Sequence, residues 1–376
     1  MPESTDAGFR WVRTGDELFA SMLAAIEAAQ RSVRLEMYIF SDSSIGQKFR
    51  DALVRACQRG VRVRVLIDAW GSFLLSGNFW NPLVAANGEF RWFNTISLHR
   101  FGFRNHRKSL VCDEELAFVG GTNIASEWEG DGIKRGWLDY GLRLTGPLAP
   151  ALAVAFDASF ERTDLRHQRF ARIRRATSHQ KISTRDGELL LSGPGRGTSP
   201  IKSSLRDDLA GASDVRILCA YFLPPWRLRR NLMRVAERGG RVQLILAGKS
   251  DVPLSQLASR RLYHRLLESG IQIYEYQPQI HHAKLYIIDH FVYVGSANLD
   301  TRSLNINYEL LLRLPNERLA CEAQGIFDEG LLHCRKIDPV TWRHSRSLWT
   351  KFKERWAYFL LARVDPYVAQ RQLRRL

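Results

Sequence analysis

The chain has 376 residues, of which 45% are hydrophobic and 25% are charged. This composition is close to that of ordinary globular proteins and excludes collagen-like, coiled-coil and wholly disordered chains. At about 150 residues per domain, the length predicts two domains or three. An excess of 55 Lys and Arg residues over 39 Asp and Glu residues leaves a net charge of +16, which favours a polyanionic partner, either nucleic acid or an anionic membrane surface.

Signals for secretion, membrane spanning and metal binding are lacking in the sequence. No apolar run approaches the ~20 residues of a spanning helix, and residues 1–6 have no apolar stretch of the kind found in signal peptides. The five cysteines lie far apart and form no CxxC pair. This pattern disfavours a structural zinc site or a disulfide framework and favours buried, reduced thiols.

One α/β unit occurs twice along the chain. In the first copy, residues 32–40 and 61–68 are rich in β-branched and aromatic side chains and predict two strands joined by a helix. In the second copy, strands over 215–222 and 241–246 flank a helix over 228–237. Strands that alternate with helices predict an α/β fold of two pseudo-symmetric lobes, each a central mixed β-sheet flanked by helices.

The strongest signal is a duplicated His-x-Lys-x4-Asp motif. Its residues are His106, Lys108 and Asp113 in the first copy and His282, Lys284 and Asp289 in the second. Each copy is followed by an apolar strand and by Gly-x-x-Asn, which ends at Asn123 or Asn298. A single copy would be weak support, because His, Lys and Asp are common, whereas two copies with the same continuation are a specific signal.

The spacing of the motif predicts a phosphate site. A His and a Lys two residues apart on a strand point to the same face, and the next strand brings Asn123 or Asn298 to a loop at its end. Imidazole, ammonium and amide donors that converge in this way suit a phosphate group, with no metal or cofactor required. The second loop also carries Ser296, a further phosphate-binding candidate, where the first loop has Gly121.

Further acids complete each set. Asp139 follows the first motif and Glu309 follows the second. A catalytic imidazole needs an acceptor on its other nitrogen to fix its tautomer, and these two acids are candidates for orienting the histidines. The motif acids Asp113 and Asp289 either take part in catalysis or anchor the strands.

The duplicated motif resembles that of the phospholipase D superfamily, over about residues 10–315. The segments 34–40, 59–68, 137–147 and 295–303 are also similar to bacterial cardiolipin synthases of the short type without transmembrane helices. The resemblance implies a single active site at the interface of the two lobes. It also implies that His106 attacks phosphorus to form a phosphohistidine and that His282 is the acid and base. The groups implied to hold the phosphate oxygens are Lys108, Lys284, Asn123 and Asn298.

This resemblance predicts a phosphatidyltransferase that makes cardiolipin, with phosphatidylglycerol as both donor and acceptor. Because the same groups work with water as the acceptor, a phospholipase D that releases phosphatidic acid is the alternative, and a nuclease of the superfamily comes third. The expected partner is an anionic phospholipid membrane rather than nucleic acid. The expected location is peripheral, on the cytoplasmic face of a bacterial cell membrane.

Three predicted loops carry aromatic, apolar and arginine side chains where polar ones are usual, at 72–80, 98–104 and 223–226. Such loops suit insertion at the headgroup level of a bilayer. Packing between the lobes is the alternative, and aromatic residues interleaved with arginine also suit stacking on single-stranded bases.

We expect four segments: a first repeat over 1–160, a basic linker over 161–181, a second repeat over 182–315 and a basic tail over 316–376. Within the tail, Phe352, Trp356, Phe359 and Leu360 share one face of a predicted helix. This stripe predicts either an amphipathic helix that binds the membrane or a helix that docks on the second lobe.

Overall fold

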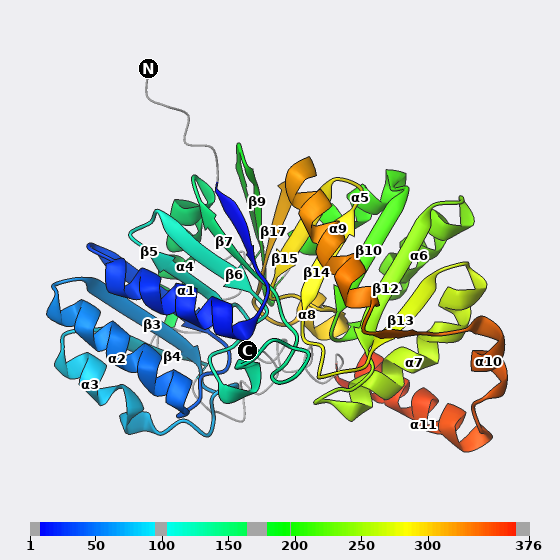
Figure 1. The fold of residues 1–376 in the computed structure, drawn as a ribbon, viewed down its shortest axis with the longest axis horizontal. Coiled ribbons are helices and arrows are strands. Elements are labelled where there is room, and N and C mark those ends of the chain that lie inside the picture. Colours follow the sequence, from blue (N-terminus) through cyan, green and yellow to red (C-terminus); the bar gives the residue numbers. More distant parts are fainter. Residues whose placement is uncertain (1–7, 95–103, 164–178, 196, 366–376) are drawn as a thin grey trace.

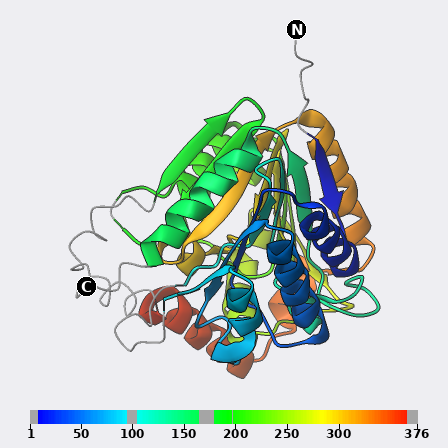
Figure 2. The same cartoon turned by 90° about the vertical axis from the view of Figure 1, so that its left-hand side faces the viewer.

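The computed structural model describes residues 8–94, 104–163, 179–195 and 197–365. They form two lobes side by side, each built around a twisted sheet (Figure 1). The view of Figure 2 shows helices of the first lobe in front of its sheet. The expected α/β fold of two lobes is confirmed.

The first sheet has seven strands. They are β1 (Phe9–Val12), β2 (Ser32–Met37), β3 (Arg62–Asp68), β4 (Glu89–Phe93), β5 (Ser109–Cys112), β6 (Leu116–Gly120) and β7 (Gly141–Thr145). Their order in the sheet is β1-β7-β6-β5-β2-β3-β4. The strands β2, β3 and β4 run parallel, and the other neighbours are antiparallel.

The second sheet has nine strands. They are β8 (Gln180–Thr184), β9 (Gly187–Ser192), β10 (Asp214–Cys219), β12 (Arg241–Ala247), β13 (Gln272–Tyr276), β14 (Lys284–Ile288), β15 (Phe291–Gly295), β17 (Glu309–Pro315) and β18 (Cys334–Lys336). Their order is β18-β13-β12-β10-β14-β15-β17-β9-β8. Without its two edge strands, β18 and β8, this sheet repeats the order and the directions of the first. A separate parallel pair joins β11 (Phe222–Leu223) and β16 (Leu299–Asp300).

Helices cover the sheets. They are α1 (Gly15–Ala28), α2 (Ser44–Gln58), α3 (Asn81–Ala85), α4 (Leu148–Thr163), α5 (Pro200–Gly211), α6 (Trp226–Glu237), α7 (Pro253–Glu268), α8 (Thr301–Asn305), α9 (Glu317–Leu331), α10 (Pro339–His344) and α11 (Leu348–Phe359). The equivalent helices α2 and α6 end at equivalent glycines, Gly60 and Gly239, whose φ angles are 87° and 88°. Glycine takes this left-handed conformation without a Cβ penalty, which explains the same stop in both repeats.

The central strands are buried on both faces, which explains their nearly continuous apolar sequence. In β5, Val111 faces the core between the sheets, whereas Leu110 and Cys112 face the core under α1 and α2. In β14, Leu285 and Ile287 face the same central core. Alternate side chains of each motif strand therefore hold the strand between two layers.

The two lobes share one hydrophobic core. The helices α4 and α9 both contribute buried side chains to it, among them Leu152 and Ala153 from α4 and Ile326 and Phe327 from α9. Strands of both sheets line the same core. The edges of the sheets that carry the motifs are thereby held in a common frame.

The segment after residue 315 begins with a helix that packs into the shared hydrophobic core. Helix α9 packs in the shared core, and β18 pairs with β13 at the edge of the second sheet. Helices α10 and α11 follow and pack against α7. Most of the predicted linker, residues 164–178, lies outside the described residues, and the division into repeats, linker and tail stays a proposal.

None of the helices in the described part of the chain has both the length and the apolar character that crossing a membrane requires.

Candidate active site

Backbone pairing across the lobes brings the two motifs together. The His106 N–H donates to the carbonyl of Tyr308, which directly precedes β17, at 2.9 Å. In the symmetric arrangement, the His282 N–H donates to the carbonyl of Leu138 at 2.8 Å. Each motif histidine therefore lies beside the segment of the other lobe that carries an acid, just before β7 in the first lobe and at the start of β17 in the second.

The acid contacts the histidine of the other lobe. His106 Nδ1 lies 3.1 Å from Glu309 Oε2, and His282 Nδ1 lies 2.8 Å from Asp139 Oδ2. When Nδ1–H donates to a carboxylate, the lone pair is on Nε2, which is then free to act on a substrate. The grouping of Asp139 with His106, and of Glu309 with His282, is therefore wrong, because the two lobes exchange their acids.

Both motif lysines are buried beside the histidines. Lys108 Nζ donates to the carbonyl of His106 at 2.7 Å, and Lys284 Nζ donates to the carbonyl of His282. Burial, and after it the positive charge of Lys284, lowers the pKa of Lys108 to about 7. Two ammonium groups that repel each other at a buried site are stabilised when an anion binds between them.

The motif histidines are neutral near pH 7 in the absence of substrate. Burial lowers the pKa of His106, although Glu309 opposes this effect. Burial also lowers the pKa of His282, and the charges of Lys284 and Lys108 lower it further. Because Lys108 comes from the first lobe, the first motif lies close to His282, as the family resemblance implies for a single site at the lobe interface.

The loop asparagines are oriented by their carbonyl oxygens. Asn123 Oδ1 accepts the N–H of Ile39 at 3.0 Å, and its Nδ2 is buried with no hydrogen-bond partner in the described structure. Asn298 Oδ1 accepts the N–H of Tyr221 at 3.4 Å. A buried amide donor without a partner costs free energy, and a phosphate oxygen would supply the missing acceptor.

Ser296 supports an acid rather than a phosphate. Its hydroxyl donates to Glu309 Oε2 and accepts a backbone N–H of β17 at 3.0 Å. The predicted phosphate-binding role of Ser296 is therefore corrected to the positioning of Glu309. In the first repeat, a Cβ at Gly121 would lie only 2.5 Å from Asp139 Oδ1, so a serine there would displace the carboxylate.

The two acids consequently differ in proton affinity. Burial raises the pKa of Asp139 to about 6. Burial also acts to raise the pKa of Glu309, but the neighbouring His106, Lys108 and Ser296 together bring it below the usual value. The two halves of the site thus have nearly the same backbone arrangement, but their acids differ in proton affinity.

Asp113 and Asp289 lie at the far ends of the motif strands. Asp113 accepts three backbone N–H groups, from residues 30–32, at 2.7 to 2.9 Å. Asp289 accepts those of residues 213 and 214 at 3.1 and 2.9 Å. About five residues of strand, at ~3.3 Å each, separate these acids from the motif lysines. Their predicted catalytic role is corrected to the alternative, anchoring of the strands.

Four aromatic residues around the histidines were missing from the sequence prediction. They are Tyr38 beside His106 and Trp128, Trp137 and Tyr221 beside His282, with ring centroids 4.7 to 6.2 Å apart. Trp128 Nε1 also donates to Asp139 Oδ2 at 3.4 Å. Tyr38 and Tyr221 occupy equivalent places in the two repeats, and this equivalence was the signal in the sequence that could have identified them.

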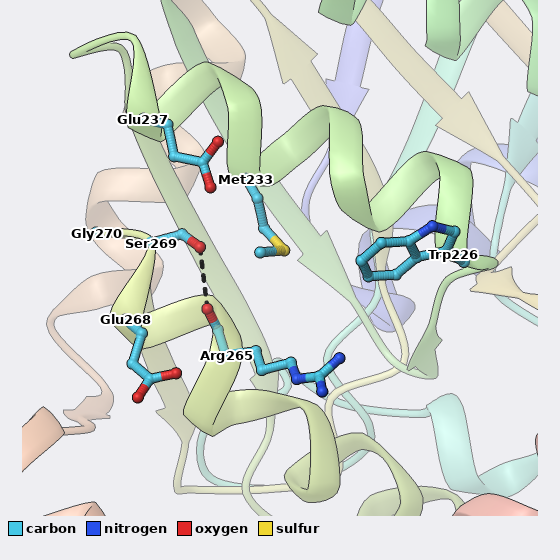
Figure 3. A pocket seen from close by; sticks show the side chains of 7 residues that line it. All are labelled: Trp226, Met233, Glu237, Arg265, Glu268, Ser269 and Gly270. Carbon is cyan, nitrogen blue, oxygen red and sulfur yellow. Dashed lines mark hydrogen bonds between the residues drawn. The ribbon is translucent and has the colours of Figure 1, made fainter.

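An open groove between α6 and α7 lies apart from this site (Figure 3). Its lining residues are Trp226, Met233, Glu237, Arg265, Glu268, Ser269 and Gly270. The groove carries charges of both signs and no motif residue, so it does not belong to the phosphate-binding site. Among the residues that the structure describes, no group of three or more His, Cys, Asp or Glu side chains is placed to hold a metal ion.

The arrangement suits transfer of a phosphoryl-linked group. Lysine and asparagine donors can hold the nonbridging oxygens, and one neutral imidazole can attack phosphorus. A bound phosphate also offsets the lysine charges, which raises the proton affinity of the other imidazole and allows it to act as an acid. Two histidines with carboxylate partners therefore meet the requirements of covalent catalysis with proton transfer.

Comparison with known proteins assigns the family. A family model described as "Cardiolipin synthase, PLD-like domain" matches residues 22–128 and 205–331, one match in each repeat. The chain is 32% identical over 380 residues to cardiolipin synthase B of Salmonella typhimurium strain LT2, an alignment that covers 95% of this chain and 88% of that protein. The chain belongs to the cardiolipin synthase family.

More distant members and the fold agree with this assignment. Cardiolipin synthase 1 of Bacillus cereus is 31% identical over 336 residues, which cover 86% of this chain and 66% of that protein. The crystal structure of a phosphatidylserine synthase from Haemophilus influenzae Rd KW20 superimposes with a TM-score of 0.73 at 17% identity, over 96% and 94% of the two chains. At this identity the structural likeness concerns the fold alone.

The exchanged acids of this family member can be tested by substitution. Asp139→Asn should perturb the ring resonances of His282, and Glu309→Gln those of His106, in NMR spectra of protein labelled with ¹⁵N-histidine. Each change should also lower turnover by about 10²- to 10⁴-fold, because the imidazole loses its preferred tautomer. Perturbation of the histidine of the same repeat would contradict the exchange.

The lysine charges predict the shape of the pH profile. Because the reaction needs one neutral and one protonated imidazole, and the pKa of each motif histidine is lowered, kcat/KM should rise as the pH falls through 6.5. Because the pKa of Lys108 is lowered to about 7, kcat/KM should decline above about pH 7 as the ammonium is lost. The measurement is kcat/KM for a soluble short-chain phosphodiester; a value that still rises toward about pH 9 would contradict it.

Proposed function

We propose that this protein is a phosphatidyltransferase that makes cardiolipin, with phosphatidylglycerol as both donor and acceptor. The observation that supports this most is the meeting of both His-x-Lys motifs, one from each lobe, in a single site of a cardiolipin synthase family member. The alternative, a phospholipase D that releases phosphatidic acid, uses the same groups with water as the acceptor.

The first step forms a covalent intermediate. His106 Nε2 attacks the phosphorus of one phosphatidylglycerol, a P–N bond forms, and the P–O bond to the headgroup glycerol breaks. His282, protonated, gives its proton to the departing glycerol oxygen, and free glycerol leaves. Lys108, Lys284 and Asn123 stabilise the charge on the nonbridging oxygens, and loss of one such donor typically costs ~10²–10³ in rate.

The second step reverses these roles. His282 removes the proton from a headgroup hydroxyl of a second phosphatidylglycerol, and that oxygen attacks the phosphorus. The P–N bond breaks, and cardiolipin leaves with both histidines restored. The assignment of His106 as nucleophile follows the order of the motifs in the superfamily. It is supported by the lowered pKa of Glu309 beside its Nδ1, against the raised pKa of Asp139 beside His282, because an ionised carboxylate stabilises the positive charge that phosphorylation places on the ring.

A membrane-binding surface is formed by the outer face of α11. Its exposed large side chains are Leu348, Trp349, Phe352, Trp356 and Phe359, each more than half exposed. The neighbouring Lys351, Lys353 and Arg355 are exposed as well. Aromatic rings beside basic groups suit the headgroup level of an anionic bilayer.

The opposite face of α11 docks on the second lobe. Glu354 and Ala357 are fully buried there, and Arg346 forms an ion pair of 2.7 Å with Glu354. Of the predicted stripe, Phe352, Trp356 and Phe359 are exposed. The two interpretations of the tail helix are therefore compatible, since one face is docked and the other is exposed.

The loop predicted over residues 72–80 to insert into the membrane likewise has both exposed and buried apolar side chains. Phe73 and Leu74 are exposed, whereas Phe79 and Trp80 are buried in the core of the first lobe. The loop that carries Phe73 and Leu74 precedes α3, and Figures 1 and 2 both place α3 and α11 along the lower edge of the molecule. Residues 98–103 of the second loop lie outside the described residues. We propose that this edge rests on the cytoplasmic face of the bacterial membrane.

The proposed reaction can be tested with purified protein and vesicles of phosphatidylglycerol. The expected products are cardiolipin and free glycerol. Activity should survive EDTA, because protein side chains rather than a metal ion donate hydrogen bonds to the phosphate. Mass spectrometry of the lipids is the measurement. Phosphatidic acid as the main product would support the hydrolase instead, and cleavage of added DNA would support the nuclease.

The membrane surface is tested by replacing two exposed indoles. Trp349→Ser combined with Trp356→Ser should weaken sedimentation with anionic vesicles by tenfold or more, since each large side chain buried in the interface contributes ~1.5–3 kcal/mol. The melting temperature should stay the same, because both indoles are more than half exposed. Leu332→Ser is the matched control, since Leu332 is 82% exposed but lies outside α11; equal losses in both variants would refute the surface.

A further inference from the structure

Two arginines, one from each lobe, lie beside the catalytic groups without belonging to them. Arg104 precedes the first motif, and its guanidinium lies over the Trp70 ring at 4.8 Å. Arg302 is in α8, which is capped by Asp300 through a bond of 2.9 Å from the Ser303 N–H. Both side chains are partly exposed, so a ligand from solvent or from a membrane can reach them.

The backbone holds these arginines close together. The carbonyl of Arg302 accepts the N–H of Asn307 at 3.0 Å, and the N–H of the next residue, Tyr308, donates to the carbonyl of Arg104 at 2.8 Å. The same stretch of Tyr308 pairs with His106. The contact between the lobes that builds the catalytic site therefore also fixes the two arginines relative to it.

Tyr38 lies between the arginines and the catalytic groups. Its ring meets the His106 ring edge-on at 4.7 Å, and Lys108 Nζ lies 5.0 Å from its centre. The side chain of Arg104 hydrogen-bonds to Tyr38, and the charge of Arg302 also acts on it. One tyrosine side chain thus interacts with the reacting imidazole and with both guanidinium groups.

Charges of both signs lie around this pair. Burial lowers the pKa of Arg104, and the nearby charge of Arg302 adds to this, against the opposing effects of Tyr38 and Asp68. Asp68 already accepts N–H groups of residues 70, 71 and 105. Asp365, which is partly exposed, forms an ion pair of 3.5 Å with Arg302, and the charge of Arg302 also acts on the carboxylate of Asp300. Two planar guanidinium groups held together are suited to a phosphate, which they can bind in a bidentate manner.

We propose that Arg104 and Arg302 bind the phosphodiester of the acceptor phospholipid. This inference rests on the proposed function, because only a phospholipid acceptor carries a second phosphate. That phosphate stands one glycerol length from the attacking hydroxyl, while the lysines and asparagines hold the donor phosphate at the histidines. Tyr38 contacts both His106 and Arg104, so a single side chain spans from the reacting imidazole to the proposed second phosphate position.

Competition between two acceptors tests this site. Vesicles of phosphatidylglycerol are incubated with ethanol, and cardiolipin and phosphatidylethanol are measured in the same reaction. Both products come from the same covalent intermediate, so their ratio depends on the acceptor alone. Arg302→Gln and Arg104→Gln should each lower the ratio of cardiolipin to phosphatidylethanol by about tenfold or more, as expected for the loss of a charge-assisted contact.

Two further variants sharpen the comparison. Arg302→Lys keeps the charge but loses the planar fork, so its ratio should lie between those of the wild type and Arg302→Gln. Arg318→Gln is the matched control, because Arg318 is an exposed arginine of α9 whose ion pair with Glu322 lies on the surface. Its ratio should equal that of the wild type.

The outcomes separate the two proposals. An unchanged ratio in Arg302→Gln and Arg104→Gln would overturn the acceptor site, as would an equal loss of both products, since that would place the arginines in the catalytic or folding machinery. A wild-type protein that forms phosphatidylethanol but no cardiolipin would instead refute the proposed function.

Discussion

Each lobe supplies the carboxylate that contacts the motif histidine of the other lobe, and the rest of the structure depends on this interaction. Glu309 of the second lobe holds His106 of the first, and Asp139 of the first lobe holds His282 of the second. Both acids are buried, and a buried carboxylate that loses its partner costs several kcal/mol. Neither lobe can therefore complete its histidine alone. Two further features keep the two halves of the site in register. They are the hydrophobic core to which α4 and α9 both contribute, and the backbone hydrogen bonds at Tyr308 and Leu138.

Within that frame, the site is poised for an anion. Two buried lysines and two neutral imidazoles lie together, and burial and the lysine charges hold the pKa of His282 down. Phosphate binding offsets those charges and raises the proton affinity of one histidine, so that it carries a proton when the leaving group needs one. Substrate binding and proton transfer are coupled in this way through ordinary electrostatics. The two acids have different neighbours, because Ser296 donates to Glu309 whereas Gly121 offers no hydroxyl to Asp139. A nearly symmetric backbone therefore supports two different histidine roles.

The surface of the molecule extends this arrangement toward the lipid. The aromatic face of α11 points to solvent while its other face is docked. Asp365, which follows the helical turn after α11, lies 3.5 Å from Arg302. A bilayer that rests on α11 would therefore present headgroups close to the arginines and to the catalytic histidines. An acceptor anchored in the same membrane as the donor reaches the intermediate at a high effective concentration, which favours transfer to lipid over transfer to water.

The sequence by itself determined the fold class, the duplication and most of the residues proposed to bind phosphate. These features depend on local properties, namely the alternation of apolar residues along strands, the spacing of His and Lys on one strand face, and the recurrence of the whole pattern. It also marked Asp139 and Glu309 as partners of the histidines. Only the tertiary structure decided which acid contacts which histidine, because the partners are 203 and 143 residues apart and come from different lobes. It likewise assigned Asp113 and Asp289 to strand anchoring, Ser296 to the support of Glu309, and one face of α11 to docking. In each case the role of the residue depends on which groups lie close to it in the folded protein. The number of residues between two positions in the sequence does not give their distance in the fold.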